Sequence, residues 1–162
     1  MLKEIRHINF FVLDILGIYT DLDALNNVAV FEIDPLDEEK LGKIINIGIQ
    51  NGVFFVIDEF HAFPFSKYKA LRYLILAGRN KGSGWLAITQ FPSLVPKAVI
   101  GNANLSFLFS IHEKNAIEYL VRTYEISREE LMSLDSHEFY IAEYEKVLRD
   151  KSGKPKKFIL QI

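Results

Sequence analysis

The chain has 162 residues, of which 49% are hydrophobic and 13% aromatic, and its formal net charge at pH 7 is −2. This length suits one domain with a substantial core, and the near-neutral charge means that binding to a polyanion would need a local patch. The absence of cysteine excludes disulfide scaffolds and thiolate sites and fits a reducing compartment, so we predict a cytoplasmic localisation. No apolar run reaches the roughly 20 residues of a membrane helix, so no membrane span is expected.

The first third of the chain alternates strand and helix patterns. Residues 8–13 ("INFFVL") and 28–33 ("VAVFEI") are short runs of β-branched and aromatic side chains, which predict strands. Residues 37–50 place their apolar side chains on one helical face, and Gly52 is available as a C-terminal stop. Residues 53–57 ("VFFVI") are continuously apolar, as expected for a parallel strand buried on both faces.

The alternation continues through the middle of the chain. Ser66 can cap a helix that runs to about Arg79, where "KGSG" ends it. Residues 85–89 ("WLAIT") and 105–111 ("LSFLFSI") are two further candidates for buried strands, and a helix is predicted over 114–124.

The last segment has a different pattern. Ser127 and Glu130 match a capping box, which predicts another short helix. Residues 139–147 and 157–162 flank "RDKSGKP" and predict a terminal β-hairpin. The whole pattern predicts an α/β fold over residues 1–162, a single domain with a mostly parallel sheet flanked by helices and a C-terminal β-hairpin.

Acidic residues follow three of the predicted strands, namely Asp14, Asp34 and the adjacent pair Asp58 and Glu59. In parallel sheets, ligands bind beyond the carboxyl ends of the strands, and carboxylates there suit a hard divalent cation. Asp58 and Glu59 point to opposite sides of their strand, so one can bind a metal while the other orients a water. Asp34 precedes a proline and is interpreted as a turn and helix start. The role of Asp14 stays open.

Other polar residues lie near these strand ends. His61 lies among phenylalanines, so it is interpreted as a packed or capping residue, although a ligand or base is also possible. Gln90 ends the strand 85–89, where its amide can bind a phosphate oxygen or a water. Arg79 and Lys81 either complement a helix C-terminus or reach a phosphate, with a phosphate on a neighbouring subunit as one form of the second alternative.

The order of these motifs resembles that of the P-loop ATPases of the HerA–FtsK superfamily, which include DNA-translocating, conjugation and viral genome-packaging ATPases. "FFVLDILGIY" is similar to the family's second strand, and "VFFVIDEFHAF" is similar to its Walker B strand. "ITQFPSLVPKAVIGNAN" resembles the family's Thr-Gln strand end with its proline-containing loop. The resemblance implies the RecA-like core of P-loop NTPases.

The resemblance also implies site residues, cofactors and partners. Asp58 would bind Mg²⁺, Glu59 would polarise the attacking water, and Gln90 would sense the γ-phosphate of ATP. Arg79 is a candidate arginine finger that acts across the interface of a homo-oligomeric ring or with a partner subunit, with DNA as a possible substrate. The gene would be viral, plasmid-borne or cellular.

One family motif does not occur in these residues. The 162 residues contain no G-x-x-x-x-G-K-[ST] sequence, and the family's first strand, phosphate loop and first helix have no counterpart. Three explanations stay open: truncation, a loop supplied by a partner, or a degenerate relative kept for binding. Whether the chain hydrolyses ATP by itself is therefore left open.

Three functions follow from these observations. The first is a nucleotide-hydrolysing motor domain of a DNA-translocating or genome-packaging ATPase, incomplete without a Walker A loop. The second is a non-catalytic ATPase-fold subunit that binds protein or nucleic acid. The third is a Mg²⁺-dependent phosphoryl-transfer or nuclease-like enzyme that uses Asp14, Asp58 and Glu59 as metal ligands. The basic stretch "RDKSGKPKK" is either a solvated hairpin or a patch for a polyanion.

Overall fold

The chain divides after Gln90 into two units in the computed structural model, which describes residues 8–160. Each unit has its own sheet, and the predicted single domain over the whole chain stays a prediction. Among the described residues, no helix has both the length and the apolar character needed to cross a membrane.

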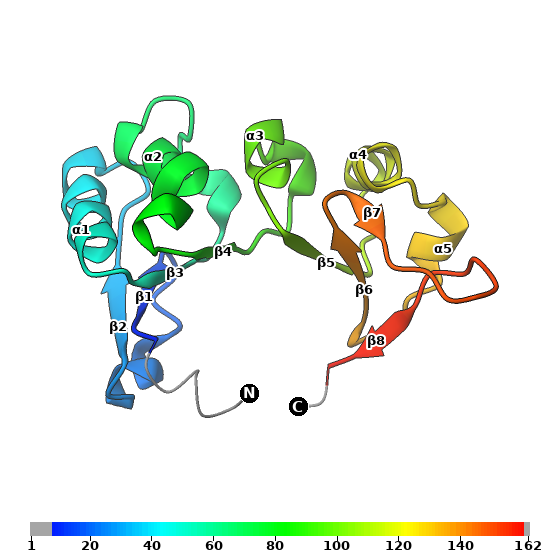
Figure 1. Cartoon of the computed structure of the whole chain (residues 1–162), viewed down its shortest axis with the longest axis horizontal. Coiled ribbons are helices and arrows are strands. Elements are labelled where there is room, and N and C mark those ends of the chain that lie inside the picture. The colour runs from blue at the N-terminus through cyan, green and yellow to red at the C-terminus, as the bar shows by residue number, and fades with distance from the viewer. Residues whose placement is uncertain (1–7, 161–162) are drawn as a thin grey trace. The chain divides into compact units, whose positions relative to one another are not determined.

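Sheet A of the first unit consists of four parallel strands in the order β2-β1-β3-β4 (Figure 1). The strands are β1 (Phe10–Asp14), β2 (Val28–Glu32), β3 (Phe54–Ile57) and β4 (Trp85–Ala87). Each coincides with a predicted strand but differs from it by up to two residues at an end, and β1 continues one residue past its prediction to Asp14. The prediction of a mostly parallel sheet flanked by helices is confirmed for this unit.

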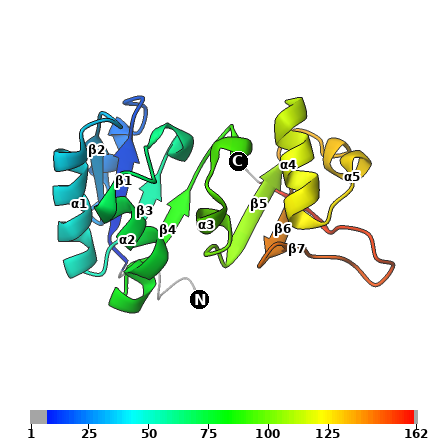
Figure 2. The ribbon, with the colours of Figure 1, turned by 90° about the horizontal axis from the view of Figure 1, so that it is seen from above.

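Two helices cover one face of sheet A, namely α1 (Glu38–Gln50) and α2 (Lys69–Ala77). The chain advances in one direction from β2 to β3 to β4, and the right-handed crossover rule therefore puts both helices on the same side, as Figure 2 shows. The Asp37 carboxylate caps α1 by accepting from the Lys40 amide at 2.9 Å. Gly52 follows α1 with a φ of 62°, as expected of a C-terminal stop.

The start of α2 differs from the prediction. Ser66 does not cap the helix, which begins at Lys69 after Tyr68 and has no side-chain cap. The preceding residues form turns instead, and Phe63, Phe65 and Tyr68 are buried in the core. Packing of these aromatic rings therefore fixes this segment, and the capping preference of Ser66 does not decide it.

Short 3₁₀ helices connect several elements: η2 (Thr20–Ala24), η3 (Phe60–Ala62), η4 (Gly78–Lys81) and η5 (Pro92–Leu94). Three of them lie in the first unit and η5 lies in the second.

The second unit is built on sheet B, an antiparallel sheet in which β6 is central. Its strands are β5 (Leu105–Phe109), β6 (Glu138–Glu143), β7 (Lys146–Val147) and β8 (Lys157–Ile159), and its helices are α3 (Lys97–Ile100), α4 (Lys114–Tyr124) and α5 (Arg128–Met132). The predicted capping box of Ser127 and Glu130 is present. The residues that form the buried core are Leu108, Ile117, Leu120, Tyr124, Ile126, Leu131, Leu134, Tyr140, Ala142 and Val147.

The interpretation of β5 as a buried strand of the parallel sheet is wrong. It pairs antiparallel with β6, and its side chains at Leu105, Phe107 and Phe109 are about half exposed. Phe107 and Phe109 contact the ring of Phe139, which also stacks on Phe158 at 5.7 Å between centroids. The apolar run is therefore a half-exposed strand that presents aromatic side chains on one face of sheet B. Sequence periodicity alone does not distinguish such a strand from a fully buried one.

The predicted C-terminal hairpin is present, but its first predicted strand consists of two strands, β6 and β7. The predicted strand 139–147 is broken at Tyr144 and Glu145, whose φ values of 47° and 70° form a tight turn between β6 and β7. β8 then pairs with the first part of β6, and Arg149 and Pro155 form a bridge at the base of the "DKSGK" turn.

Arg149 joins three parts of the second unit. Its guanidinium donates to the Glu130 carboxylate at 2.9 Å, to the Glu125 carbonyl and to the Gly153 carbonyl. These hydrogen bonds connect α5, the end of α4 and the terminal hairpin. The hydrogen bond from Arg149 is the main reason that the pKa of Glu130 lies below its ordinary value of 4.5.

We expect Arg149→Ala to lower the free energy of unfolding at pH 7 by about 1 kcal/mol, because both side chains of the ion pair are partly exposed. A lowered carboxyl pKa stabilises the fold above the unfolded value and loses this effect as the pH falls through the folded value. The difference between the variant and the parent should therefore shrink below about pH 4.5, the ordinary pKa of Glu130. Urea unfolding at pH 7 and pH 3 measures this, and an equal difference at both values would contradict it.

Candidate active site

Asp14 ends β1 and organises the loop that follows it. Its buried carboxylate accepts hydrogen bonds from three backbone amides, those of Leu16 at 3.1 Å, Gly17 at 2.9 Å and Tyr19 at 2.9 Å. The hydrogen bonds from these three amides stabilise the negative charge of the carboxylate, which burial has separated from water. The carboxylate is therefore occupied by its own loop, which gives no support to its use as a metal ligand. Asp34 has the predicted turn role, with a hydrogen bond from the Leu36 amide.

Asp58 lies directly after β3 and is 6% exposed. Its amide donates to the Leu13 carbonyl of β1 at 3.2 Å, which extends the parallel pairing to the site. Tyr19 lies close to it, and burial followed by the nearby Asp58 carboxylate raises the pKa of the Tyr19 phenol. The loop organised by Asp14 thus brings a phenol to Asp58.

Glu59 adopts a left-handed backbone conformation with a φ of 46°, which is uncommon for a residue with a side chain. This conformation ends β3 and begins η3. The Gln90 amide donates to Glu59 Oε1 at 3.1 Å, so the predicted pair of residues from the ends of β3 and β4 is brought together. Backbone strain of this kind costs about 1 kcal/mol or more and is concentrated at functional sites.

The second carboxylate oxygen of Glu59 is buried and accepts no hydrogen bond from the residues that the structure describes. His61 Nδ1 lies 3.2 Å from it, and the two side chains are 17% and 16% exposed. The same His61 nitrogen lies 3.1 Å from the Thr89 hydroxyl. A buried carboxylate oxygen without a donor is a group that a bound water or ligand could satisfy.

The sequence was interpreted as placing His61 in a packed or capping role. In the structure, its ring lies against two polar side chains of the candidate site. It contacts Glu59 and Thr89 at once, which makes it a residue that orients the carboxylate. Sequence reasoning gave no role to Tyr19, and it included Thr89 only as part of the Thr-Gln strand end, without a role of its own. Thr89 had a usable signal, since it precedes Gln90 at the same strand end.

Arg79 lies at the opposite end of the unit. It belongs to η4, after α2 and before β4 begins, and Gly82 in the next turn approaches Gly52 at the start of β3. Asp58, Glu59 and Gln90 follow the carboxyl ends of β3 and β4. Arg79 is therefore at the amino ends of the strands and does not reach the carboxylates of its own chain.

These residues fit part of a Mg²⁺–nucleotide site. The buried Asp58 carboxylate suits a hard cation that keeps several waters, and the unsatisfied oxygen of Glu59 suits a water. Within residues 8–160, no cluster of three or more histidine, cysteine, aspartate or glutamate side chains could hold a metal by itself. Mg²⁺ bound by one carboxylate and substrate phosphates needs no such cluster.

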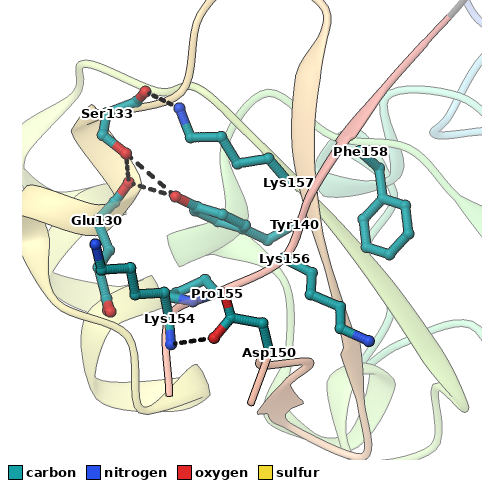
Figure 3. Close-up of a pocket in the computed structure, with 9 residues that line it drawn as sticks. All are labelled: Glu130, Ser133, Tyr140, Asp150, Lys154, Pro155, Lys156, Lys157 and Phe158. Carbon is teal, nitrogen blue, oxygen red and sulfur yellow. Dashed lines mark hydrogen bonds between the residues drawn. The ribbon is translucent and has the colours of Figure 1, made fainter. Parts of the chain in front are cut away.

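A second polar region lies in the second unit, where a pocket of about 700 Å³ lies beside the terminal hairpin. Figure 3 shows the residues that line it. Lys157 donates to the Ser133 carbonyl at 2.6 Å and to Glu138 at 2.8 Å, and Arg149 is paired with Glu130. The remaining basic side chains of the stretch are exposed, and none has an acidic partner within 4 Å among the described residues: Lys151, Lys154 and Lys156. The alternatives of a solvated hairpin and a polyanion patch both stay open.

The parallel sheet, the helices on its face and the acids at its strand ends define an α/β fold with polar side chains at the carboxyl ends of the strands. Comparison with solved structures confirms the predicted resemblance to the HerA–FtsK superfamily at the level of the fold. No family model and no curated protein matches the sequence.

Two of the similar structures are viral. The genome-packaging NTPase B204 of Sulfolobus turreted icosahedral virus 2, in complex with AMPPCP, is 20% identical with a TM-score of 0.71, and the match covers 99% of this chain and 87% of that one. The DNA-packaging ATPase B204 of Sulfolobus turreted icosahedral virus is 17% identical with a TM-score of 0.73, covering 96% and 84%.

A third similar structure is the cytoplasmic domain of the type VII secretion ATPase EccC of Thermomonospora curvata. It is 13% identical with a TM-score of 0.57, and the match covers 84% of this chain and 20% of that one. At these identities the likeness shows the fold alone.

Proposed function

We propose that this chain supplies the metal-binding and water-activating half of an ATP site in a genome-packaging type of motor. The observation that carries this proposal is the Glu59–Gln90 pair, 3.1 Å apart at the ends of adjacent strands, with one Glu59 oxygen buried and unsatisfied. Carboxylate and amide groups in this position suit the orientation of a water for attack on a phosphate.

Each residue has a distinct role in the proposed site. Asp58 holds Mg²⁺, which when bound draws charge from the phosphates. Glu59 accepts a proton from the attacking water at its unsatisfied oxygen, and Gln90 holds the other oxygen in place. His61 fixes the carboxylate from its second side. Arg79 acts on a neighbouring subunit, which agrees with its distance from the carboxylates of its own chain.

The similar structures support this proposal through their own ligands. The B204 NTPase was solved with AMPPCP, with ATP-gammaS and with AMP, so the shared fold holds nucleotides in that protein. Assembly into a ring and action on DNA are part of the same proposal. The free lysines of the terminal hairpin are the described residues best suited to contact a phosphate backbone.

A second candidate function is a non-catalytic subunit with the ATPase fold. The observation that favours it is the lack of a G-x-x-x-x-G-K-[ST] loop in the 162 residues, since backbone amides and a lysine normally hold the phosphates. The two functions differ in whether nucleotide binds.

We expect Mg-ATP to stabilise the protein, by about 2.7 kcal/mol where the ligand is at 100 times its dissociation constant. Thermal unfolding with and without Mg-ATP measures this shift, and Asp58→Asn should remove its dependence on Mg²⁺. Mg²⁺ alone is the control, because a shift without nucleotide that Asp58→Ala abolishes would favour the metal-dependent nuclease. No shift at millimolar Mg-ATP would contradict an ATP site formed by this chain alone.

A further inference from the structure

The chain segment after β4 runs alongside the segment after β3. The Ile88 amide donates to the Ile57 carbonyl and the Phe60 amide donates to the Ile88 carbonyl, both at 2.9 Å. These backbone hydrogen bonds continue the parallel pairing past Ala87, the last residue of β4. The backbone therefore fixes the position of the next residue, Thr89, beside the residues that follow β3.

Two consecutive residues reach the two oxygens of the Glu59 carboxylate. The Gln90 amide donates to Oε1 at 3.1 Å. Thr89 Oγ1 lies 3.1 Å from His61 Nδ1, and the same nitrogen lies 3.2 Å from Glu59 Oε2. Gln90 therefore contacts the carboxylate directly, whereas Thr89 reaches it through the ring of His61.

His61 Nδ1 has an oxygen atom of each of these two side chains beside it, and it carries at most one hydrogen. A carboxylate oxygen only accepts hydrogen bonds, whereas a hydroxyl either donates or accepts. With a hydrogen on Nδ1, the ring attracts both oxygens. Without one, the lone pair of Nδ1 faces the negative charge of Glu59 across 3.2 Å. The neighbours of this nitrogen therefore favour the ring form that carries its hydrogen on Nδ1.

The two contacts of Nδ1 differ in direction although their lengths are nearly equal. The contact with the Thr89 hydroxyl has the geometry of a hydrogen bond. The buried Oε2 atom of Glu59 accepts no hydrogen bond from residues 8–160. The Nδ1 hydrogen of His61 therefore goes to the Thr89 hydroxyl, and Oε2 keeps its accepting capacity.

We propose that Thr89 is a positioning residue of the candidate site. Its hydroxyl binds the Nδ1 hydrogen of His61, holds the ring beside Glu59 and thereby keeps Oε2 open to a water. This inference rests on the proposed function, in which Oε2 accepts a proton from that water. A hydrogen bond from His61 to Oε2 would fill this position and lower the basicity of the carboxylate, because a hydrogen bond to the charged form stabilises it.

Nitrogen NMR of the histidine rings tests this inference in the chain without nucleotide. At a pH above the titration of the ring, His61 should have a protonated Nδ1 and a bare Nε2. The chemical shifts of the two ring nitrogens distinguish this form from the opposite one. A bare Nδ1 in the parent chain would overturn the inference, and this measurement needs no variant of Thr89.

Thr89→Val and Thr89→Ser are the matched variants, because only serine keeps the hydroxyl. In Thr89→Val the Nδ1 hydrogen should turn to Oε2 and its proton signal should move downfield, since hydrogen bonds to an ionised group are shorter and stronger. Thr89→Ser should keep the parent signal, and the signals of His112 and His137 should be the same in all three chains. An unchanged His61 signal in Thr89→Val, or an equal shift in both variants, would overturn the inference.

Steady-state turnover gives a second readout of the role of Thr89. Thr89→Val should lower kcat about tenfold or more at an unchanged KM for Mg-ATP, because a small misplacement of a catalytic group is costly. Thr89→Ser should keep most of the parent kcat. A larger effect on KM than on kcat would show that Thr89 contributes to nucleotide binding, and would contradict the positioning role.

The two kinds of measurement separate this inference from the proposed function. The expected NMR signals, with no effect of Mg-ATP on the chain, support the role of Thr89 in holding His61 and contradict the ATP site. Binding of Mg-ATP, with a His61 signal that is the same in the parent and in Thr89→Val, supports the ATP site and contradicts the inference.

Discussion

Gly48→Ala is expected to lower the free energy of unfolding by about 1–3 kcal/mol, although alanine normally stabilises a helix relative to glycine. Gly48 lies in α1 against the sheet, where an added Cβ would meet the Phe55 ring at 2.3 and 3.0 Å and the Phe11 ring at 3.1 Å. Phe55 is fully buried, so its ring has no free space to move into. The steric cost therefore exceeds the helix-propensity gain of about 0.5–1 kcal/mol.

Gly42 on the same helix provides the control. An added Cβ there would meet nothing closer than the Ala70 side chain at 4.0 Å. Gly42→Ala should therefore stabilise the fold by about 0.5–1 kcal/mol, through helix propensity and lower entropy of the unfolded chain. Urea unfolding of both variants measures the two effects, and a destabilised Gly42→Ala with an unaffected Gly48→Ala would show that α1 packs differently.

Local sequence signals predicted the elements whose structure is locally determined. The helix 114–124 and the Ser127–Glu130 capping box agree with the prediction, because hydrogen bonds within a few residues define them. The predicted environment of β5 was wrong, because its partner is β6 and the pairing joins residues from Phe109↔Phe139 to Leu105↔Glu143, which are 30 to 38 positions apart. Apolar composition shows that a strand forms, but it does not show which sheet contains the strand.

The candidate site was predictable where the rule on strand ends applied. That rule places Asp58, Glu59 and Gln90 at one edge, and the 3.1 Å contact between Glu59 and Gln90 agrees with it. The left-handed backbone of Glu59 and the contacts of His61 were not predictable, because they depend on how η3 folds back against β4. The loop role of Asp14 likewise depends on backbone amides, which carry no sequence signal.

Glu59→Gln is expected to raise the free energy of unfolding by about 1 kcal/mol while it abolishes the proposed activity. The stability effect follows from the buried Oε2 atom, which carries charge but accepts no hydrogen bond from the described residues, although His61 Nδ1 lies 3.2 Å away. An amide removes this charge at almost the same volume. Thermal unfolding of the chain alone measures this effect, and a loss of stability would show that the carboxylate is better satisfied than the geometry indicates.

The effect of Glu59→Gln on hydrolysis is expected to be larger, a fall in kcat of about 10²–10⁴-fold, because an amide cannot accept the proton of the attacking water. Nucleotide binding should be unchanged, since Asp58 keeps the metal and the exchange alters no phosphate contact. Steady-state turnover in the assembly that contains a phosphate loop, together with a binding titration, separates the two quantities. Asp58→Asn is the contrasting variant and should lose Mg²⁺-dependent binding first. If Glu59→Gln loses binding and turnover together, Glu59 holds the nucleotide and does not activate water.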